Sequence, residues 1–238
     1  MQATSLPLTN VVQMRIGVIG GSGPAGSALG ARLASVGYEV VIGSRSKYRA
    51  METRDEIVAM HPELESLLDY GENVVAAECD LVVIATPWDS AATMAQQLAP
   101  QLHGKIVVSM ANALVRVGSE FEPLIPPRGS VAAHVQAAAP NSRVVAAFHH
   151  LPAKELGAIG HPIDSDVLIC ADDPVAVTTV SEIAAKIPGC RPLDAGELSN
   201  ATAIEAFTAV LLQLNVRYKT RVAPKLTGIN RDPRAVEG

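Results

Sequence analysis

The chain has 238 residues, a length that fits one large domain or two small ones. Hydrophobic residues make up 48% of it and charged residues 18%, which excludes a disordered chain. Aromatic residues make up only 3% and the net charge is −5, so we expect neither a nucleic-acid binder built on stacked aromatic side chains nor a broad basic surface for nucleic acid.

The beginning of the chain carries no pattern of a targeting segment. Residues 1–13 are polar, have no hydrophobic period and are predicted to form a disordered extension. The whole chain contains no stretch of 18 uncharged apolar residues. Its three cysteines, Cys79, Cys170 and Cys190, form no CxxC pair and are odd in number. We therefore expect a cytoplasmic protein without a membrane partner.

Strand and helix patterns alternate, with short connections, through the first half of the chain. Short apolar runs predict buried strands at 15–20, 38–42, 73–76, 81–85 and 105–109. Helical spacing of apolar residues predicts helices at 24–36, 46–60 and 88–99, and residues 61–71 are predicted to be a connection. Such alternation predicts parallel strands joined by right-handed helical crossovers.

The second half of the chain is less regular. Pro123, Pro126 and Pro127 indicate a loop. Later patterns predict strands at 143–148, 166–170 and 190–196, and helices at 131–139, 174–187 and 198–218. The last helix is apolar nearly all round, which is typical of a helix buried between partners. We therefore expect it at a domain or subunit interface and expect a homodimer.

A glycine-rich loop links the first predicted strand to the first predicted helix. It reads Gly21-Ser22-Gly23-Pro24-Ala25-Gly26, and its place between a buried strand and an amphipathic helix is that of a dinucleotide-binding loop. We expect Gly21 to form the tight turn, Gly23 to let a pyrophosphate approach the backbone, and Gly26 to let helix and strand pack closely. The start of the helix then offers free N–H groups to phosphate oxygens.

The residues after the second strand favour NADP over NAD. NAD sites usually place a carboxylate there, whereas this chain has Gly43-Ser44-Arg45, followed by Lys47 and Arg49. Arg45 can hold a 2′-phosphate with its planar guanidinium, and Ser44 can donate a hydrogen bond. Each charge-assisted bond contributes about 1.5–3 kcal/mol, so we expect an NADP(H) site. The alternative is a solvated, basic start of a helix.

Polar residues also follow two later strands. Thr86 and Pro87 come after the strand at 81–85, where the carboxyl ends of parallel strands line a ligand crevice. His149 and His150 follow the strand at 143–148, and bond either to a ligand or to nearby backbone. The spacing of the histidines matches no standard zinc motif, so no metal site is expected.

Five segments occur in an order that resembles a known family. They read IGVIGGSGPAG, VVIGSR, LVVIATPW, FHHLPA and RPLDAGELSNATAIEAFTAVLLQLN. Together they are similar to the NADPH-dependent reductases of the 5-deazaflavin coenzyme F420, also called F420H2:NADP oxidoreductases, over residues 14–215. The GGSG loop alone is generic, and the combination of the GSR, TPW and PLDAGxLSN segments is much more specific.

The resemblance implies an α/β fold of two parts, with a Rossmann-type parallel sheet over 14–148 and a smaller C-terminal α/β domain over 149–238. The deazaflavin would lie in the cleft between them. The implied NADP contacts are Ser22, Gly23, Pro24 and Ala25 in the loop, Ser44, Arg45 and Arg49 at the 2′-phosphate, Thr86 and Pro87 along the cofactor, and Ala153 near the nicotinamide. The implied deazaflavin contacts are His149, Leu151 and Pro152.

The implied activity is hydride transfer between nicotinamide C4 and deazaflavin C5. The two coenzymes react directly, so no catalytic side chain is required. Two other functions fit the same loop and basic residues. One is an NADPH-dependent reductase of another acceptor, such as a flavin, a metal chelate or an imine. The other is a non-catalytic NADP(H) sensor, and the second domain favours catalysis over it.

Overall fold

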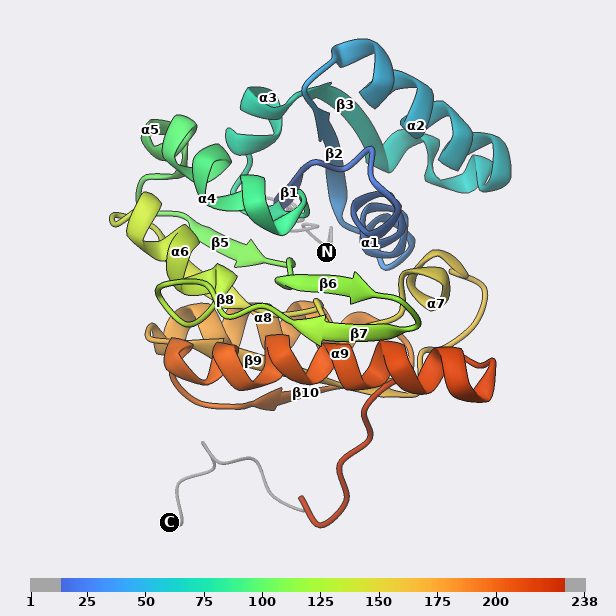
Figure 1. Ribbon diagram of the computed structural model, residues 1–238. Coiled ribbons are helices and arrows are strands. Elements are labelled where there is room, and N and C mark those ends of the chain that lie inside the picture. Colours follow the sequence, from blue (N-terminus) through green and yellow to red (C-terminus); the bar gives the residue numbers. More distant parts are fainter. Residues whose placement is uncertain (1–13, 230–238) are drawn as a thin grey trace, which may run out of the picture.

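Eight strands form the central sheet of the computed structural model, which describes residues 14–229; the extension predicted at 1–13 lies outside this range. The strands are β1 (Arg15–Ile19), β2 (Glu39–Ser44), β3 (Leu68–Glu72), β4 (Leu81–Ile84), β5 (Ile106–Ser109), β8 (Arg143–Ala146), β9 (Ser165–Ala171) and β10 (Cys190–Asp194). They lie side by side in the order β10-β9-β8-β5-β4-β1-β2-β3 (Figure 1).

The sheet is parallel except at one junction. Every neighbouring pair runs parallel apart from β8 and β9, which are antiparallel. The predicted α/β fold with a Rossmann-type parallel sheet is therefore confirmed. Strand direction changes between β8 and β9, next to the predicted domain boundary at 148/149, but β9 and β10 continue the same sheet. The division into two domains stays a prediction.

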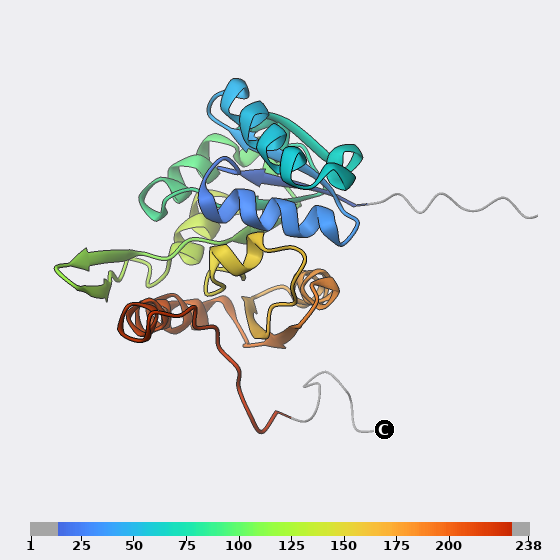
Figure 2. The ribbon, with the colours of Figure 1, turned by 90° about the vertical axis from the view of Figure 1, so that its right-hand side faces the viewer.

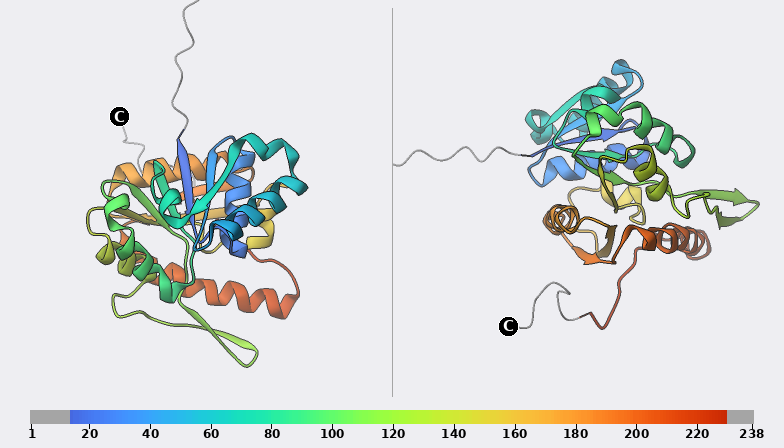
Figure 3. Two further views of the ribbon diagram at one scale, coloured as in Figure 1. Left: turned by 90° about the horizontal axis from the view of Figure 1, so that it is seen from above. Right: turned by 90° about the vertical axis from the view of Figure 1, so that its left-hand side faces the viewer.

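Helices cover both faces of the sheet (Figure 3). The first face packs against α1 (Pro24–Ser35), α2 (Lys47–Met60), α7 (Ala153–Gly157) and α8 (Pro174–Lys186). The second packs against α3 (Asn73–Ala77), α4 (Trp88–Gln97), α5 (Ala99–Leu102), α6 (Val131–Ala138) and the start of α9 (Ala201–Tyr218). In β4, Val83 joins the first core while Val82 and Ile84 join the second. Burial on both faces explains why these strands read as continuous apolar runs.

Residues 73–76, predicted as a strand, form α3 instead, so this prediction is wrong. The strand lies just before them: the predicted connection at 61–71 contains a 3-10 helix (Pro62–Leu67) and the start of β3. A four-residue apolar run cannot be assigned to strand or helix from its period. Packing favours the helix here, since α3 lies close against β1. A Cβ at Gly17 of β1 would be only 1.8 Å from the Ala76 carbonyl oxygen, so this close contact requires glycine.

A hairpin that was not predicted projects from the body of the molecule (Figure 2). It consists of β6 (Leu114–Val117) and β7 (Glu120–Pro123), which pair antiparallel. It contacts α9, where the Phe121 N–H donates to Gln213 Oε1 at 3.2 Å. Six of its eight strand residues are exposed, so neither strand carries the buried, alternating face that would mark it in the sequence.

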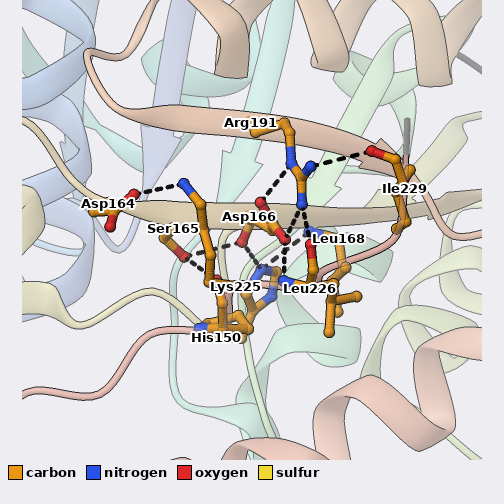
Figure 4. Close-up of polar contacts among 10 residues, drawn as sticks. His150, Asp164, Ser165, Asp166, Leu168, Arg191, Lys225, Leu226 and Ile229 are labelled. Atoms are coloured by element: carbon orange, nitrogen blue, oxygen red, sulfur yellow. Dashed lines mark hydrogen bonds and ion pairs between the residues drawn. The ribbon is translucent and has the colours of Figure 1, made fainter. Parts of the chain in front are cut away.

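The segment after α9 is tied to β9 through a fully buried carboxylate (Figure 4). Asp166 accepts two hydrogen bonds from the Arg191 guanidinium, at 2.8 and 2.7 Å, and one from the Leu226 N–H at 2.5 Å. Burial opposes ionisation of Asp166, but these three donors outweigh it and lower its pKa. The Asp166 N–H also donates to the Pro224 carbonyl at 2.8 Å. Asp166 therefore fastens the C-terminal segment to the sheet.

Helix α9 buries one side and exposes the other. Ala201, Ile204 and Leu211 are buried, whereas Phe207 and Val210 are 41% and 50% exposed. The exposed side of α9 is apolar in part, and the expected place of this helix at a domain or subunit interface stays a prediction. Across residues 14–229, no helix is long and apolar enough to cross a membrane.

A buried glutamate joins α9 to the start of α6. Glu205 accepts hydrogen bonds from the N–H groups of Val131 and Ala132, at 2.8 and 3.1 Å, and the Ser130 hydroxyl accepts from the Ala133 N–H. Three N–H groups of the first helical turn are thus satisfied. Burial nevertheless raises the pKa of Glu205 to about 7, against the opposing effect of the two N–H donors.

The raised pKa of Glu205 predicts a pH-dependent stability. A pKa higher in the folded than in the unfolded protein stabilises the fold below pH 4.5, and this stabilisation is lost as pH rises through 7. Relative to a Glu205→Gln variant, wild type should lose on the order of 2–3 kcal/mol of unfolding free energy between pH 4.5 and 8. Urea unfolding of both proteins measures this, with Glu182→Gln on the exposed side of α8 as control. A difference that does not change with pH contradicts the prediction.

Candidate functional site

A cavity of about 890 Å³ opens at the carboxyl ends of β1, β2 and β4. The strand order reverses here, since β2 and β3 lie on one side of β1 and β4 and β5 on the other. Sheets of this type bind ligands at that point. The predicted site residues that line the cavity are Ser22, Gly23, Pro24, Ser44, Arg45, Arg49, Thr86 and Pro87. Three segments far apart in the sequence are therefore brought together as expected.

The turn after β1 is made by Gly20 rather than by Gly21. Gly20 has a φ of 74°, which side chains rarely adopt, and a Cβ there would lie 2.9 Å from Thr86 Cγ2. Gly21 instead packs beside β2, donating its N–H to the Gly43 carbonyl at 2.8 Å. The role predicted for Gly26 is confirmed, because a Cβ there would lie 2.8 Å from the Gly20 oxygen and 3.1 Å from Ala85 Cβ.

The loop leads directly into the first turn of α1. Gly23 is the N-cap residue and Pro24 the first helical residue. A helix leaves the N–H groups of its first turn without intrahelical acceptors, and Ala25 and Gly26 lie in that turn. A Cβ at Gly23 would meet only the Gly20 oxygen at 3.4 Å, so its backbone is open on the remaining sides. This end of α1 can receive an anion.

The end of β2 supplies hydroxyl and cationic groups to the same cavity. Ser44 is buried, and its hydroxyl lies 3.0 Å from the hydroxyl of Ser22 in the loop. Arg45 and Arg49 are exposed at the start of α2 and line the cavity. In the part of the chain that the structure describes, no carboxylate forms an ion pair with either arginine. The two guanidinium groups are therefore available to a phosphate.

Asn73 is a cavity residue that the sequence did not reveal. It is buried at the start of α3, and its Oδ1 accepts from the Gly20 N–H at 3.2 Å. It therefore holds the turn glycine in place. The available signal was an asparagine before an apolar run, which is typical of a helix start. Further lining residues that were not predicted are Gly20, Ser46, Ala85, Asp89, Ser90, Thr93, Met94 and Gln97.

The segment predicted to contact the deazaflavin follows β8. His149 and Leu151 are buried, Pro152 is the N-cap residue of α7, and Ala153 begins that helix. None of these four lines the 890 Å³ cavity. They lie instead at the carboxyl end of β8, which pairs with β5, on the same edge of the sheet as the cavity. Their contact with a coenzyme stays a prediction.

Comparison with known proteins places the chain in a family. The family model described as NADP oxidoreductase, coenzyme F420-dependent, matches residues 15–113. An F420-dependent NADP reductase from Methanocaldococcus jannaschii is 35% identical over 213 residues, which cover 87% of this chain and 95% of the relative. The chain belongs to the F420-dependent NADP reductase family.

Two further matches extend this result. An F420-dependent NADP reductase from Methanothermobacter thermautotrophicus is 30% identical over 91% of this chain and 95% of its own length. A crystal structure of a protein from Arthrobacter sp. FB24 matches with a TM-score of 0.75 at 24% identity, over 87% of this chain and 96% of that one. The latter supports the fold.

In this member of the F420-dependent NADP reductase family, several buried polar atoms lack partners near the predicted nicotinamide end. They are Thr86 Oγ1, Ser109 Oγ, Asn112 Oδ1 and both ring nitrogens of His149, and none has a hydrogen-bond partner among residues 14–229. They follow or end three adjacent strands, β4, β5 and β8. Buried polar atoms are rarely left unpaired, so these fit a ligand with polar edges.

The two adjacent histidines have different surroundings. Burial, with a smaller effect of His150, lowers the pKa of His149 to about 3, and burial lowers that of His150 to about 4. Both rings are therefore neutral near pH 7. His150 Nε2 lies 3.1 Å from the Leu168 nitrogen and 3.2 Å from the Asp166 oxygen, so the β9 backbone engages it. Among residues 14–229, both ring nitrogens of His149 but only Nδ1 of His150 are left without a hydrogen-bond partner, so His149 has more to offer a ligand.

The cysteines and acidic residues form no metal site in the described range. Between residues 14 and 229, no three His, Cys, Asp or Glu side chains are grouped closely enough to hold a metal ion. Cys79 and Cys170 are buried, and burial raises the pKa of the Cys170 thiol to about 12.

Proposed function

We propose that this protein transfers a hydride between C4 of NADP(H) and C5 of coenzyme F420. The observation that carries the proposal is the convergence of the glycine loop, Ser44 and Arg45 on one cavity at the switch point of the sheet. Membership of the F420-dependent NADP reductase family supports the same activity.

On this proposal, the NADP(H) phosphates are bound at two places. The first turn of α1 receives the pyrophosphate, with Ser22, Gly23, Pro24 and Ala25 as its contacts. Ser44, Arg45 and Arg49 hold the 2′-phosphate, and Thr86 and Pro87 lie along the path to the nicotinamide. No carboxylate ends β2, so nothing at that position repels the 2′-phosphate.

The second coenzyme is proposed to lie against the segment after β8. His149, Leu151 and Pro152 contact the deazaflavin, and Ala153 contacts the nicotinamide. The two coenzymes supply the hydride chemistry when bound. The protein holds them in register and excludes water, and orientation alone contributes several kcal/mol, of the order known for intramolecular reactions. Neutral His149 offers one donor and one acceptor nitrogen to a ring edge without placing a charge there.

Absorbance assays test the proposed activity. The protein is mixed with NADPH and one acceptor at a time: F420, FMN, a ferric chelate or a cyclic imine. We expect NADPH to be consumed with F420, and NADH to be a much poorer donor. Turnover with another acceptor but not with F420 would favour the wider class of NADPH-dependent reductases. Tight NADPH binding without turnover of any acceptor would favour a sensor.

We also infer that the protein is a cytoplasmic homodimer. Free cysteines support a reducing compartment. Phe207 and Val210, which are exposed one turn apart on α9, support a dimer, because an exposed apolar patch often marks a contact between proteins.

The dimer proposal predicts a change of mass in solution. Sedimentation analysis of wild type should give twice the chain mass of 24.9 kDa. Val210→Asp, which puts a charge on the exposed side of α9, should shift the protein toward monomer by at least tenfold in dissociation constant. Val175→Asp on α8 is the control, since Val175 is also exposed but lies on another helix. A monomeric wild type, or equal effects of both substitutions, would contradict this interface.

A further inference from the structure

Arg32 is a fully buried arginine on α1 that binds the main chain of one distant segment. Its guanidinium donates to five carbonyl oxygens at 2.8–3.1 Å, those of Glu155, Leu156, Ala158, Ile159 and His161. Since an arginine side chain has five N–H groups, every donor is used. The buried guanidinium therefore uses all of its donors to hold one short stretch of main chain.

The five carbonyls belong to the end of α7 and the turn that follows it. Helix α7 has only five residues and would not persist without outside contacts. The carbonyl end of a helix carries partial negative charge, which the guanidinium offsets. Helix α7 lies directly beside α1 (Figures 1 and 2), and a Cβ on Gly157 would be 3.5 Å from Ala28 Cβ. Arg32 thus fixes α7 against α1.

The segment proposed to contact the coenzymes lies immediately before the first residue of α7. His149, Leu151 and Pro152 come immediately before Ala153, the first residue of the helix. Phe148 is buried with a φ of 63°, which a bulky side chain adopts only when its surroundings impose it. Asn112 Nδ2 holds this segment from the β5 side by donating to the His149 carbonyl at 2.7 Å. Helix α7 holds it from the other side.

We propose that Arg32 is a positioning residue that sets the segment 149–153 relative to the phosphate loop. The loop enters α1 at Pro24, and Arg32 lies eight residues, or about 12 Å, further along the same helix. One rigid element therefore carries both the anion site and the clamp on α7. Arg32 is not among the residues that line the cavity, so it acts through α7. This role rests on the proposed function, because the spacing matters only when a second ring binds against segment 149–153.

Arg32→Lys tests the proposal, because lysine keeps the charge but has one nitrogen in place of the fork. We expect kcat for F420 reduction to fall at least tenfold, while KM and the fluorescence-measured Kd for NADPH change less than threefold. Hydrogen exchange of the amides at 149–161 should become at least tenfold faster. Loss of stability alone would not produce this split between kcat and Kd.

Gln136→Met is the matched control. The Gln136 side chain also spans main-chain groups, donating to the Ala139 and Ser142 carbonyls and accepting from the Val144 N–H, but at the amino end of β8. It should lower the melting temperature and leave kcat within twofold of wild type. Equal losses of kcat in both variants would overturn the proposal, as would unchanged exchange at 149–153 in Arg32→Lys.

The test remains decisive in two further cases. If Arg32→Lys does not fold, exchange in wild type is read instead: the amides of α7 should open only together with those of α1, and an independent, easier opening of α7 would overturn the clamp. If wild type does not reduce F420, the proposed function fails, while the exchange measurements still report whether Arg32 holds segment 149–153.

Discussion

Replacing Arg45 with alanine is expected to raise KM for NADPH about 10- to 100-fold, and to leave KM for NADH nearly unchanged. The guanidinium lines the cavity at the end of β2, beside the buried hydroxyl of Ser44. A charge-assisted hydrogen bond contributes about 1.5–3 kcal/mol, which corresponds to that range of affinity. NADH lacks the 2′-phosphate and loses nothing. Steady-state kinetics with both coenzymes measure the change in preference.

Lys47→Ala is the control for Arg45→Ala. Lys47 belongs to the same basic cluster at the start of α2 but does not line the cavity. If the cluster acted only as a general positive surface, both substitutions would weaken NADPH binding to the same extent. High salt would then remove the difference in affinity between each variant and wild type. A selective effect of Arg45→Ala requires direct contact with the phosphate. An Arg45→Ala variant that still prefers NADPH as strongly as wild type would exclude the proposed 2′-phosphate site.

The first βαβ unit could be predicted closely because burial and chemistry agree there. Strands β1 and β2 are covered on both faces, so their residues form continuous apolar runs, and the loop between β1 and α1 has few residue types that fit its geometry. The place of Ser44 and Arg45 in the site could also be predicted, because the parallel order brings the ends of β1 and β2 to the same edge. The site at the first loop therefore needed only local patterns and one topological rule.

The features that could not be predicted depend on contacts between distant residues. Asn73 reaches Gly20 only because α3 packs on β1, and its short apolar sequence reads equally well as strand. Gly20 forms the turn through its approach to Thr86, which the motif spacing does not encode. One signal was available at Arg32, since a charged residue four positions from Ala28 and three from Leu29 lies on the buried face of a helix. The sequence does not say which carbonyls it binds.

Gly23→Ala should separate binding from folding more sharply than any other change in the loop. Gly23 has a φ of −84°, which alanine adopts freely, and the new Cβ would meet only the Gly20 oxygen at 3.4 Å. The free energy of unfolding should therefore change by less than about 1 kcal/mol, because the smaller number of unfolded conformations of alanine opposes its poorer fit at the N-cap position. The methyl group would stand where the pyrophosphate approaches the backbone. Affinity for NADPH should fall at least tenfold, as measured by fluorescence titration beside urea unfolding.

Gly160→Ala provides the comparison for this change. Gly160 is exposed, a Cβ there would have no atom within 4 Å, and its φ lies outside the left-handed region. It should show the same small effect on stability as Gly23→Ala and no change in NADPH affinity. If Gly23→Ala binds NADPH as tightly as Gly160→Ala does, the pyrophosphate does not approach the first turn of α1. The cavity would then have to receive its ligand in another orientation, and the roles of Ser44 and Arg45 would change with it.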